Sequence, residues 1–198
     1  EEYVKSAGLA FNRNQILQYY MIFGGVPYYW GFLKKGQSLS QNIDSILFEK
    51  DAPLRDEFKY LYASVFKKPE NYVKIIEALG TKKVGMTREE IITSTKIPNS
   101  GDLTTKLEEL ESCGFIHKYN AFGMKKKNAV YQLMDCFTLF YFKFLKSEPT
   151  DEHFWTNQIN TPAVNTWLGL AFERVCMEHV DQIKMKLGIS GVLTEVNS

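Results

Sequence analysis

Most signatures of a nucleotide-binding or catalytic site are missing from this sequence. Its 198 residues contain no GxxxxGK[ST] phosphate loop, no HExxH, no paired CxxC and no GxSxG motif. Without the phosphate loop, the chain cannot by itself hold a nucleotide in the P-loop manner. No internal repeat and no low-complexity segment is present either.

Cysteines are few, and long apolar runs are absent. Cys113, Cys136 and Cys176 lie far apart without metal-ligand spacing, so we expect reduced core thiols in a cytoplasmic protein. No signal peptide is visible. The longest apolar run, 137–145, is much shorter than a membrane span and includes Lys143. These absences predict no membrane partner.

The chain also lacks a charge of one sign. Its 24 Lys and Arg stand against 23 Asp and Glu, so the formal net charge of +1 makes no case for nucleic acid. Apolar residues (44%) and aromatic residues (14%) are plentiful, enough for real cores in one large or two small domains. His117, His153 and His179 stand apart in the sequence, and we expect structural roles for them because a catalytic site needs a positioned partner.

The stretch 69–135 predicts the first two helices of a winged helix. Residues 70–79 have apolar side chains at i, i+3, i+4 and i+7, and Gly80 is expected just beyond the helix end. Thr87 and Glu90 predict a capping box at the start of the second helix.

A third helix and a β-hairpin complete this pattern. The third helix begins after the turn 96–101, turns three leucines inward and ends at Gly114. Those leucines are Leu103, Leu107 and Leu110. Residues 115–119 and 129–133 alternate like strands around a turn rich in Lys and Gly. Helix, helix, helix and hairpin is the winged-helix plan.

The flanking segments predict further helices. Residues 1–68 predict a lid-like helical bundle, and the winged-helix domain with its following aromatic helix takes 69–146. Residues 147–198 predict a linker, one long helix and a truncated strand, so the fold class is mainly α. In the bundle, one helix is expected to end at Gly24-Gly25, and the next, over 28–35, to have Pro27 in its first turn. A third helix is expected over 41–50 with Ser40 as its N-cap. A fourth is expected to begin at Pro53, with an apolar stripe of Leu54, Phe58, Leu61 and Val65. The long helix is expected over 163–187, ended by Gly188.

The charges around the third helix bear on DNA binding. Its outward face carries Thr104 and Thr105, and the stretch 101–112 has a net charge of −3, from four acids against Lys106, which would repel phosphates. The hairpin tip 125–127 is three lysines, Lys125, Lys126 and Lys127. Two interpretations of this tip stay open: contact with a phosphate backbone, or a solvated tip that prevents edge pairing. A protein or interdomain module is at least as well supported as a reader of DNA sequence.

Both ends of the sequence suggest a fragment of a larger protein. The chain begins without Met, and the strand-like run 192–196 has no partner strand after it. We therefore expect neighbouring domains on both sides.

Taken together, the motifs resemble a known family. These are Gly24-Gly25-Val26-Pro27-Tyr28 in a helical bundle, the winged-helix pattern from Leu103 to Ile116, Tyr131-x-Leu133-x-Asp135 with the aromatics that follow it, and Gly169-x-x-Phe172-Glu173. In this order they resemble the C-terminal half of prokaryotic and archaeal AAA-type ATPases of the signal-transducing, STAND-like branch. In that family a P-loop domain precedes a helical lid, a winged helix and a restriction-endonuclease-like domain.

The resemblance implies roles that the residues alone do not show. Residues 1–68 would be the lid, with Gly24, Gly25, Val26 and Pro27 close to the nucleotide. Glu173 would match the acid on the first helix of the nuclease-like fold, whose other metal-binding residues would follow Ser198. ATP and Mg²⁺ would be bound by the parent protein. The fragment itself would hold no cofactor or metal and would have no catalytic residue.

Two classes of function remain open. One is a non-catalytic regulatory and binding part of an AAA-type ATP-binding protein, whose winged helix makes interdomain, protein or weak non-specific DNA contact. The other is a stand-alone winged-helix transcription regulator. The second class requires a basic recognition helix, whereas the third helix here is acidic.

Overall fold

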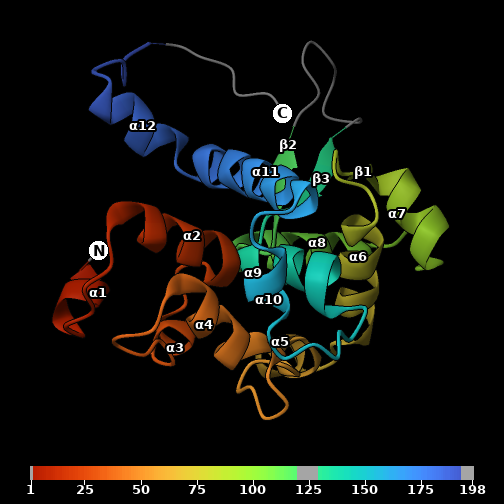
Figure 1. The fold of residues 1–198 in the computed structure, drawn as a ribbon. Helices are drawn as coiled ribbons and strands as arrows, with labels where there is room; N and C mark the ends of the chain where they lie inside the picture. Colours follow the sequence, from red (N-terminus) through yellow and green to blue (C-terminus); the bar gives the residue numbers. More distant parts are fainter. Residues whose placement is uncertain (1, 120–128, 193–198) are drawn as a thin grey trace. The chain divides into compact units, whose positions relative to one another are not determined.

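A computed structural model describes residues 2–119 and 129–192 of the chain. Over these residues the fold is mainly helical with a small antiparallel sheet, which confirms the expected fold class (Figure 1). The expected hairpin tip at Lys125–Lys127 and the end of the expected last strand, 193–196, lie outside the described residues.

The chain divides into two compact units. Unit 1 combines residues 1–60 with 136–175, and unit 2 combines 61–135 with 176–198. Two helices, α5 (Glu57–Val65) and α11 (Pro162–Glu178), run from one unit into the other. The other elements of unit 1 are α1 (Glu2–Ser6), α2 (Arg13–Phe23), α3 (Pro27–Trp30), α4 (Leu39–Ile43), η1 (Asp44–Phe48), α9 (Cys136–Phe140), η3 (Tyr141–Leu145) and α10 (Phe154–Gln158).

Aromatic side chains form the core of unit 1. Phe140 of α9 and Phe144 of η3 each contact both Trp155 and Trp167, with ring centroids 5.2–5.3 Å apart. All four side chains are buried. Tilted and edge-to-face pairs of this kind stabilise a core beyond the area that they bury. The segment 137–146, which the sequence analysis groups with the winged helix, thus packs within unit 1.

Two of the expected helices change from α-helical to π-helical hydrogen bonding part of the way along. The helix that begins with α4 continues as the π-helical segment η1, where the Glu49 N–H donates to the Asp44 carbonyl at 2.9 Å. The helix that begins with α9 continues as η3, where the Lys146 N–H donates to the Tyr141 carbonyl at 2.8 Å. Such wider turns are rare, and they occur often at functional sites.

Several expected boundaries in unit 1 are wrong, each for a local reason. The N-cap of α4 is Ser38 rather than Ser40, because only Ser38 has a glutamine three residues later, Gln41, to complete a capping box. The helix at Pro27 stops after Trp30, because the buried Asn42 side chain accepts from the Lys34 N–H at 2.7 Å.

The helix expected from Pro53 begins only at Glu57. Before it, the Leu54 N–H donates to the Ile46 carbonyl at 3.0 Å, which ties this segment back to η1. The expected stripe is wrong at Val65, which is 47% exposed, because the buried face shifts by one residue to Tyr62 and Phe66.

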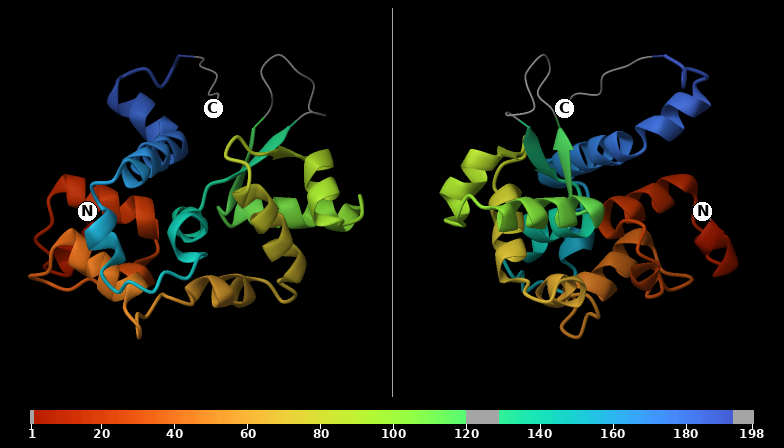
Figure 2. Two further views of the ribbon diagram at one scale, coloured as in Figure 1. Left: turned by 45° about the vertical axis from the view of Figure 1, so that its right-hand side comes forward. Right: turned by 180° about the vertical axis from the view of Figure 1, so that it is seen from behind.

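Unit 2 has the order of elements of a winged helix. Its elements are α6 (Glu70–Gly80), β1 (Met86–Thr87), α7 (Arg88–Thr95), α8 (Gly101–Ser112), β2 (Ile116–Tyr119), β3 (Val130–Leu133) and α12 (Val180–Lys186). The strands lie in the order β1–β3–β2, with Met86 paired to Tyr131 and Ile116 to Leu133. Figure 2 shows the hairpin of β2 and β3 with α8 beside it, and α8 contacts β2.

The capping box and the leucine stripe predicted for unit 2 are confirmed, but α8 begins at Gly101, within the expected turn 96–101. Thr87 and Glu90 form the expected capping box, and the three leucines of α8 are at most 1% exposed. Strand β1 was missed, because two residues are too short for an alternating pattern. Gly80 was expected just beyond the end of α6, but it is the last residue of the helix, and Thr81 is the C-cap.

The C-terminal helix and the cysteines also differ from expectation. Instead of one helix over 163–187, α11 and α12 are separated at His179. The apolar spacing of this helix predicts a buried face that includes Val164, Trp167, Ala171 and Phe172, but Phe172 is 48% exposed, because the face that α11 buries leaves it one position off. Cys136 is buried and Cys176 is half-buried, but the expectation of a core thiol is wrong for Cys113, which is exposed.

Candidate functional site

The outward face of α8 is where a winged helix would meet DNA. Thr104 and Thr105 are exposed on it, as expected, and so are Glu108 and Glu109. The one lysine of α8, Lys106, binds the Asp102 carboxylate at 2.5 Å. The cation is thus already paired within the helix, and the outward face presents carboxylates that oppose a phosphate backbone.

A tyrosine of α6 holds this face in place. The Tyr72 hydroxyl donates a short hydrogen bond to Glu109, and Lys106 Nζ lies 5.3 Å from the centre of the Tyr72 ring. The Phe66 ring stacks on the Tyr72 ring, with ring centroids 3.9 Å apart and planes 6° apart. Burial, and then the bond to Glu109, raises the pKa of Tyr72 to about 12. The acidic face is therefore fixed to the core of unit 2.

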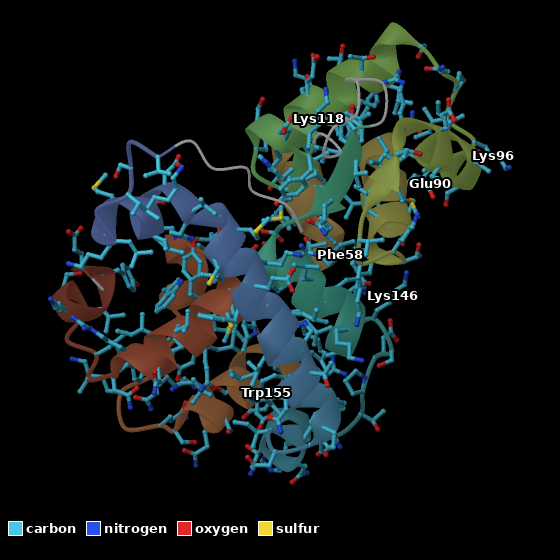
Figure 3. The ribbon with its side chains drawn as sticks, turned by 90° about the horizontal axis from the view of Figure 1, so that it is seen from above. Phe58, Glu90, Lys96, Lys118, Lys146 and Trp155 are labelled. Atoms are coloured by element: carbon cyan, nitrogen blue, oxygen red, sulfur yellow. The ribbon has the colours of Figure 1, made fainter. Side chains whose placement is uncertain are left out.

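The turn before α8 is held by an arginine. The Arg88 guanidinium, at the start of α7, donates to the Asn99 side chain at 3.0 Å and to the Ser100 carbonyl at 2.9 Å. Arg88 is the only arginine in the residues 61–119, so this cation also serves the fold. Glu90 lies in the same helix (Figure 3), and the hydrogen bond from Lys82, followed by that from the Thr87 N–H, lowers the pKa of its carboxyl.

The outer edge of strand β2 is partly closed by a carboxylate. Glu111, in the last turn of α8, accepts from the backbone N–H of Lys118 at 3.0 Å. His117 Nδ1 lies 3.8 Å from the same carboxylate oxygen. Since an exposed strand edge invites pairing with another chain, this contact lowers the tendency of the hairpin to add a strand there.

The turn of residues 24–28 in unit 1 is exposed and well held. Gly24 has φ +62°, its N–H donates to Tyr20, and its carbonyl accepts from the Trp30 indole at 2.8 Å. Gly25, Val26 and Pro27 are exposed, and Tyr28 is 62% exposed. The four residues expected near a nucleotide therefore form an apolar turn that faces solvent.

Pro27 occupies the first turn of α3, as the sequence predicts. Its missing N–H costs nothing at this position, since the first amides of a helix have no intrahelical partner. Tyr28 packs edge-on against Phe32, with ring centroids 5.0 Å apart. An exposed tyrosine that is oriented by a neighbouring ring can contribute apolar area to a contact at little cost in side-chain entropy.

Glu173 lies on α11 and is exposed, off the buried face, as its spacing predicts. Among residues 2–119 and 129–192, no group of three or more His, Cys, Asp or Glu side chains is arranged to hold a metal ion. The nuclease-like role of Glu173 stays a prediction. His117 lies in β2, whereas His153 and His179 directly precede α10 and α12.

Two charged residues with clear structural roles were not found from the sequence. Asp44 is 2% exposed and accepts from the backbone N–H groups of Trp155 at 2.8 Å and Thr156 at 3.1 Å. The Arg55 guanidinium donates to the carbonyls of Phe48, Glu49 and Pro149 at 2.7–3.2 Å. Their partners lie up to 112 residues away, so no local pattern indicates them.

No family model, curated protein or solved structure matches this chain. In the part of the chain that the structure describes, no helix combines the length and apolarity that crossing a membrane requires.

Proposed function

We propose that this chain is a non-catalytic binding and regulatory part of an AAA-type ATP-binding protein. In this proposal its winged helix contacts another domain or protein rather than reading a DNA sequence. The observation that carries the proposal is the acidic outward face of α8, whose lysine is paired with Asp102. Specific readers of DNA place a helix in the major groove and neutralise phosphates around it.

The exposed turn 24–28 supports the proposed contact with a neighbouring ATP-binding domain. A solvent-facing apolar turn that is held by the Trp30 indole suits a contact with a neighbouring domain. The family resemblance of Gly24, Gly25, Val26 and Pro27 assigns that neighbour as a P-loop domain, which would bind ATP and Mg²⁺. We place no catalytic residue in the chain itself.

DNA binding separates this proposal from a stand-alone transcription regulator. Fluorescence anisotropy with labelled duplexes of several sequences should show weak or no binding at low salt, with no preference among sequences. Replacing Glu108 with Lys should strengthen this non-specific binding, since it adds a cation to the outward face. Glu70→Lys, which makes the same charge change at the start of α6, is the matched control.

Substituting Lys125, Lys126 and Lys127 by Ala tests the hairpin tip in the same assay. Any weak DNA binding by the parent chain should be salt-sensitive, and it should disappear in the triple variant. A footprint on one specific sequence that survives the triple substitution would favour the transcription regulator and overturn the proposal.

The reading frame before residue 1 tests the ATPase part. A GxxxxGK[ST] motif there supports the proposal, and its absence contradicts it. If the motif is present, Tyr28→Ser in the longer protein should weaken the coupling of the lid-like unit to ATP hydrolysis, while Tyr60→Ser, at a similarly exposed tyrosine, should leave the activity unchanged.

A further inference from the structure

A cavity of about 160 Å³ is lined by residues of unit 1 alone, and none of them belongs to the turn 24–28. Its apolar lining comes from six residues: Leu47, Phe48, Phe58, Tyr141, Leu145 and Pro149. A cavity of about 150 Å³ can take a benzene molecule, so an occupant here has the size of one ring or one branched aliphatic side chain.

Both π-helical segments contribute walls to this cavity. Leu47 and Phe48 come from η1, and Tyr141 and Leu145 come from η3. Tyr141 also stacks on Phe58 of α5, with ring centroids 3.9 Å apart and planes 2° apart. The coincidence of two such rare segments at one cavity points to a site, because π-type turns concentrate at functional positions.

The turn at the rim holds a strained residue. Glu148 has φ +49°, one of two non-glycine residues with positive φ among the described residues, and its N–H donates to the Leu145 carbonyl at 2.8 Å. A side chain in this conformation costs free energy, and such strain is retained mostly where the position has a use. Here the conformation places a carboxylate-bearing residue on the lining of the cavity.

The charged residues of the lining are two cations and two anions. Lys59 and Asp56 pair with each other at 2.6 Å, both well exposed, and the charge of Glu148 adds to the effect of Asp56 in raising the pKa of Lys59. The half-buried Arg55 guanidinium donates only to backbone carbonyls in the described parts of the chain, and no carboxylate there neutralises it. Because one of those carbonyls belongs to Pro149, at 3.1 Å, the guanidinium lies beside the turn that carries Glu148.

We infer that this cavity binds a small zwitterion, an α-amino acid with a branched apolar side chain. The ligand carboxylate would meet Arg55, whose planar guanidinium suits a carboxylate, and its ammonium would meet Glu148. The side chain would lie between the two π-helical segments. This site shares no residue with the proposed contact surfaces, and it would make the chain responsive to a metabolite whatever its partner is.

Titration with L-leucine, followed by two-dimensional NMR of the labelled chain, tests the inference. The amide signals of Lys59, Tyr141 and Glu148 should shift together with one Kd. The des-amino analogue 4-methylpentanoate and the des-carboxy analogue 3-methylbutylamine should each bind about tenfold more weakly or worse, since each loses one charge-assisted hydrogen bond.

Two variants assign the charges. Glu148→Gln should weaken leucine about tenfold and leave 4-methylpentanoate unchanged, because only the ammonium contact is lost. Arg55→Lys keeps the positive charge but should weaken the binding of both carboxylate ligands, leucine and 4-methylpentanoate. The NMR spectrum of this variant shows directly whether its fold is kept. Glu108→Gln, at an exposed carboxylate on α8, is the control and should change nothing.

Three results would overturn the inference. The first is the absence of leucine-dependent shifts at the lining residues. The second is binding of both the amine and the carboxylate analogues as tight as the binding of leucine, which would mean that the cavity takes any apolar group, such as a side chain of a partner protein. The third is an equal effect of Glu148→Gln on leucine and on 4-methylpentanoate.

Discussion

The carboxylate of Asp44 accepts a hydrogen bond from the backbone N–H of Trp155 at 2.8 Å. Asp44 begins the π-helical segment η1, and Trp155 lies in the first turn of α10, 111 residues later. The second carboxylate oxygen accepts from the N–H and the hydroxyl of Thr156. A buried anion at these amides satisfies donors that the short helix leaves open.

Replacing Asp44 with Asn tests this contact. The amide has one acceptor oxygen in place of two and carries no charge, so the free energy of unfolding should fall by about 2–3 kcal/mol. Denaturant unfolding measures the loss. Asp51→Asn, at an exposed aspartate a few residues along, should stay within about 0.5 kcal/mol of the parent. Equal effects of the two substitutions would show that the Asp44 contact contributes nothing.

The Asp44 contact also marks a limit of what the sequence predicts. The capping box of Thr87 and Glu90 and the leucine stripe of α8 were predicted correctly, because both depend on residues at most seven positions apart. Asp44 looked like any helix acid, and only the folded chain brings it to Trp155. The expected stripe of α5 failed at Val65 for the same reason, since packing around Phe66 decides which face is buried.

The candidate site shows the same division. The sequence correctly indicated that Thr104, Thr105 and the acids of α8 face outward, because the leucines fix the orientation of the helix. The pair of Lys106 with Asp102 has the i,i+4 spacing of a helical ion pair, so the sequence contains a signal for it. The bond of Glu109 to Tyr72 of another helix has no such local signal. The cavity at Arg55 had no signal at all, because its lining comes from segments about 90 residues apart.

Gly85→Ala should destabilise unit 2 strongly. Gly85 has φ +82°, and an added Cβ would come within 2.5 Å of the Tyr131 carbonyl oxygen of β3. The substitution combines backbone strain with a clash against the sheet, and we expect a loss of about 3 kcal/mol or more in the free energy of unfolding.

Gly114→Ala separates the two causes. Gly114 has φ +77°, but nothing lies within 4 Å of its added Cβ, so only the conformational cost remains. Its loss should be about 1–2 kcal/mol. If the two alanine variants unfold at the same denaturant concentration, the contact with Tyr131 plays no part.

The raised pKa of Tyr72 predicts that the free energy of unfolding falls at alkaline pH. Its pKa in the folded chain is raised from 10 to about 12, first by burial and then by its bond to Glu109. The folded state keeps the phenol proton between these two values while the unfolded state loses it. The contribution is therefore complete below pH 10 and is lost as the pH rises toward 12.

Unfolding of Tyr72→Phe at several pH values measures this contribution. Between pH 10 and 12, the free energy of unfolding should fall less for the variant than for the parent. The variant should still show some decline, because burial also raises the pKa of Tyr19 to about 12. Glu109→Gln should give an intermediate result, because it keeps a hydrogen-bond acceptor and removes the charge. Parallel curves for Tyr72→Phe and the parent would contradict the assignment.

Lys96→Gly should stabilise the chain, unlike most substitutions. Lys96 ends α7 in the left-handed conformation, with φ 59°, and it is exposed (Figure 3). Glycine adopts this conformation without the penalty of about 1–2 kcal/mol that other residues incur, although it loses about 0.4–1 kcal/mol through the greater freedom of the unfolded chain. The net gain should be about 0.5–1 kcal/mol. Lys74→Gly, the same change in the interior of α6, should instead cost about 1 kcal/mol. Denaturant unfolding of both variants gives the two signs, and a loss at Lys96 as large as that at Lys74 would show that the left-handed backbone there is not a source of strain.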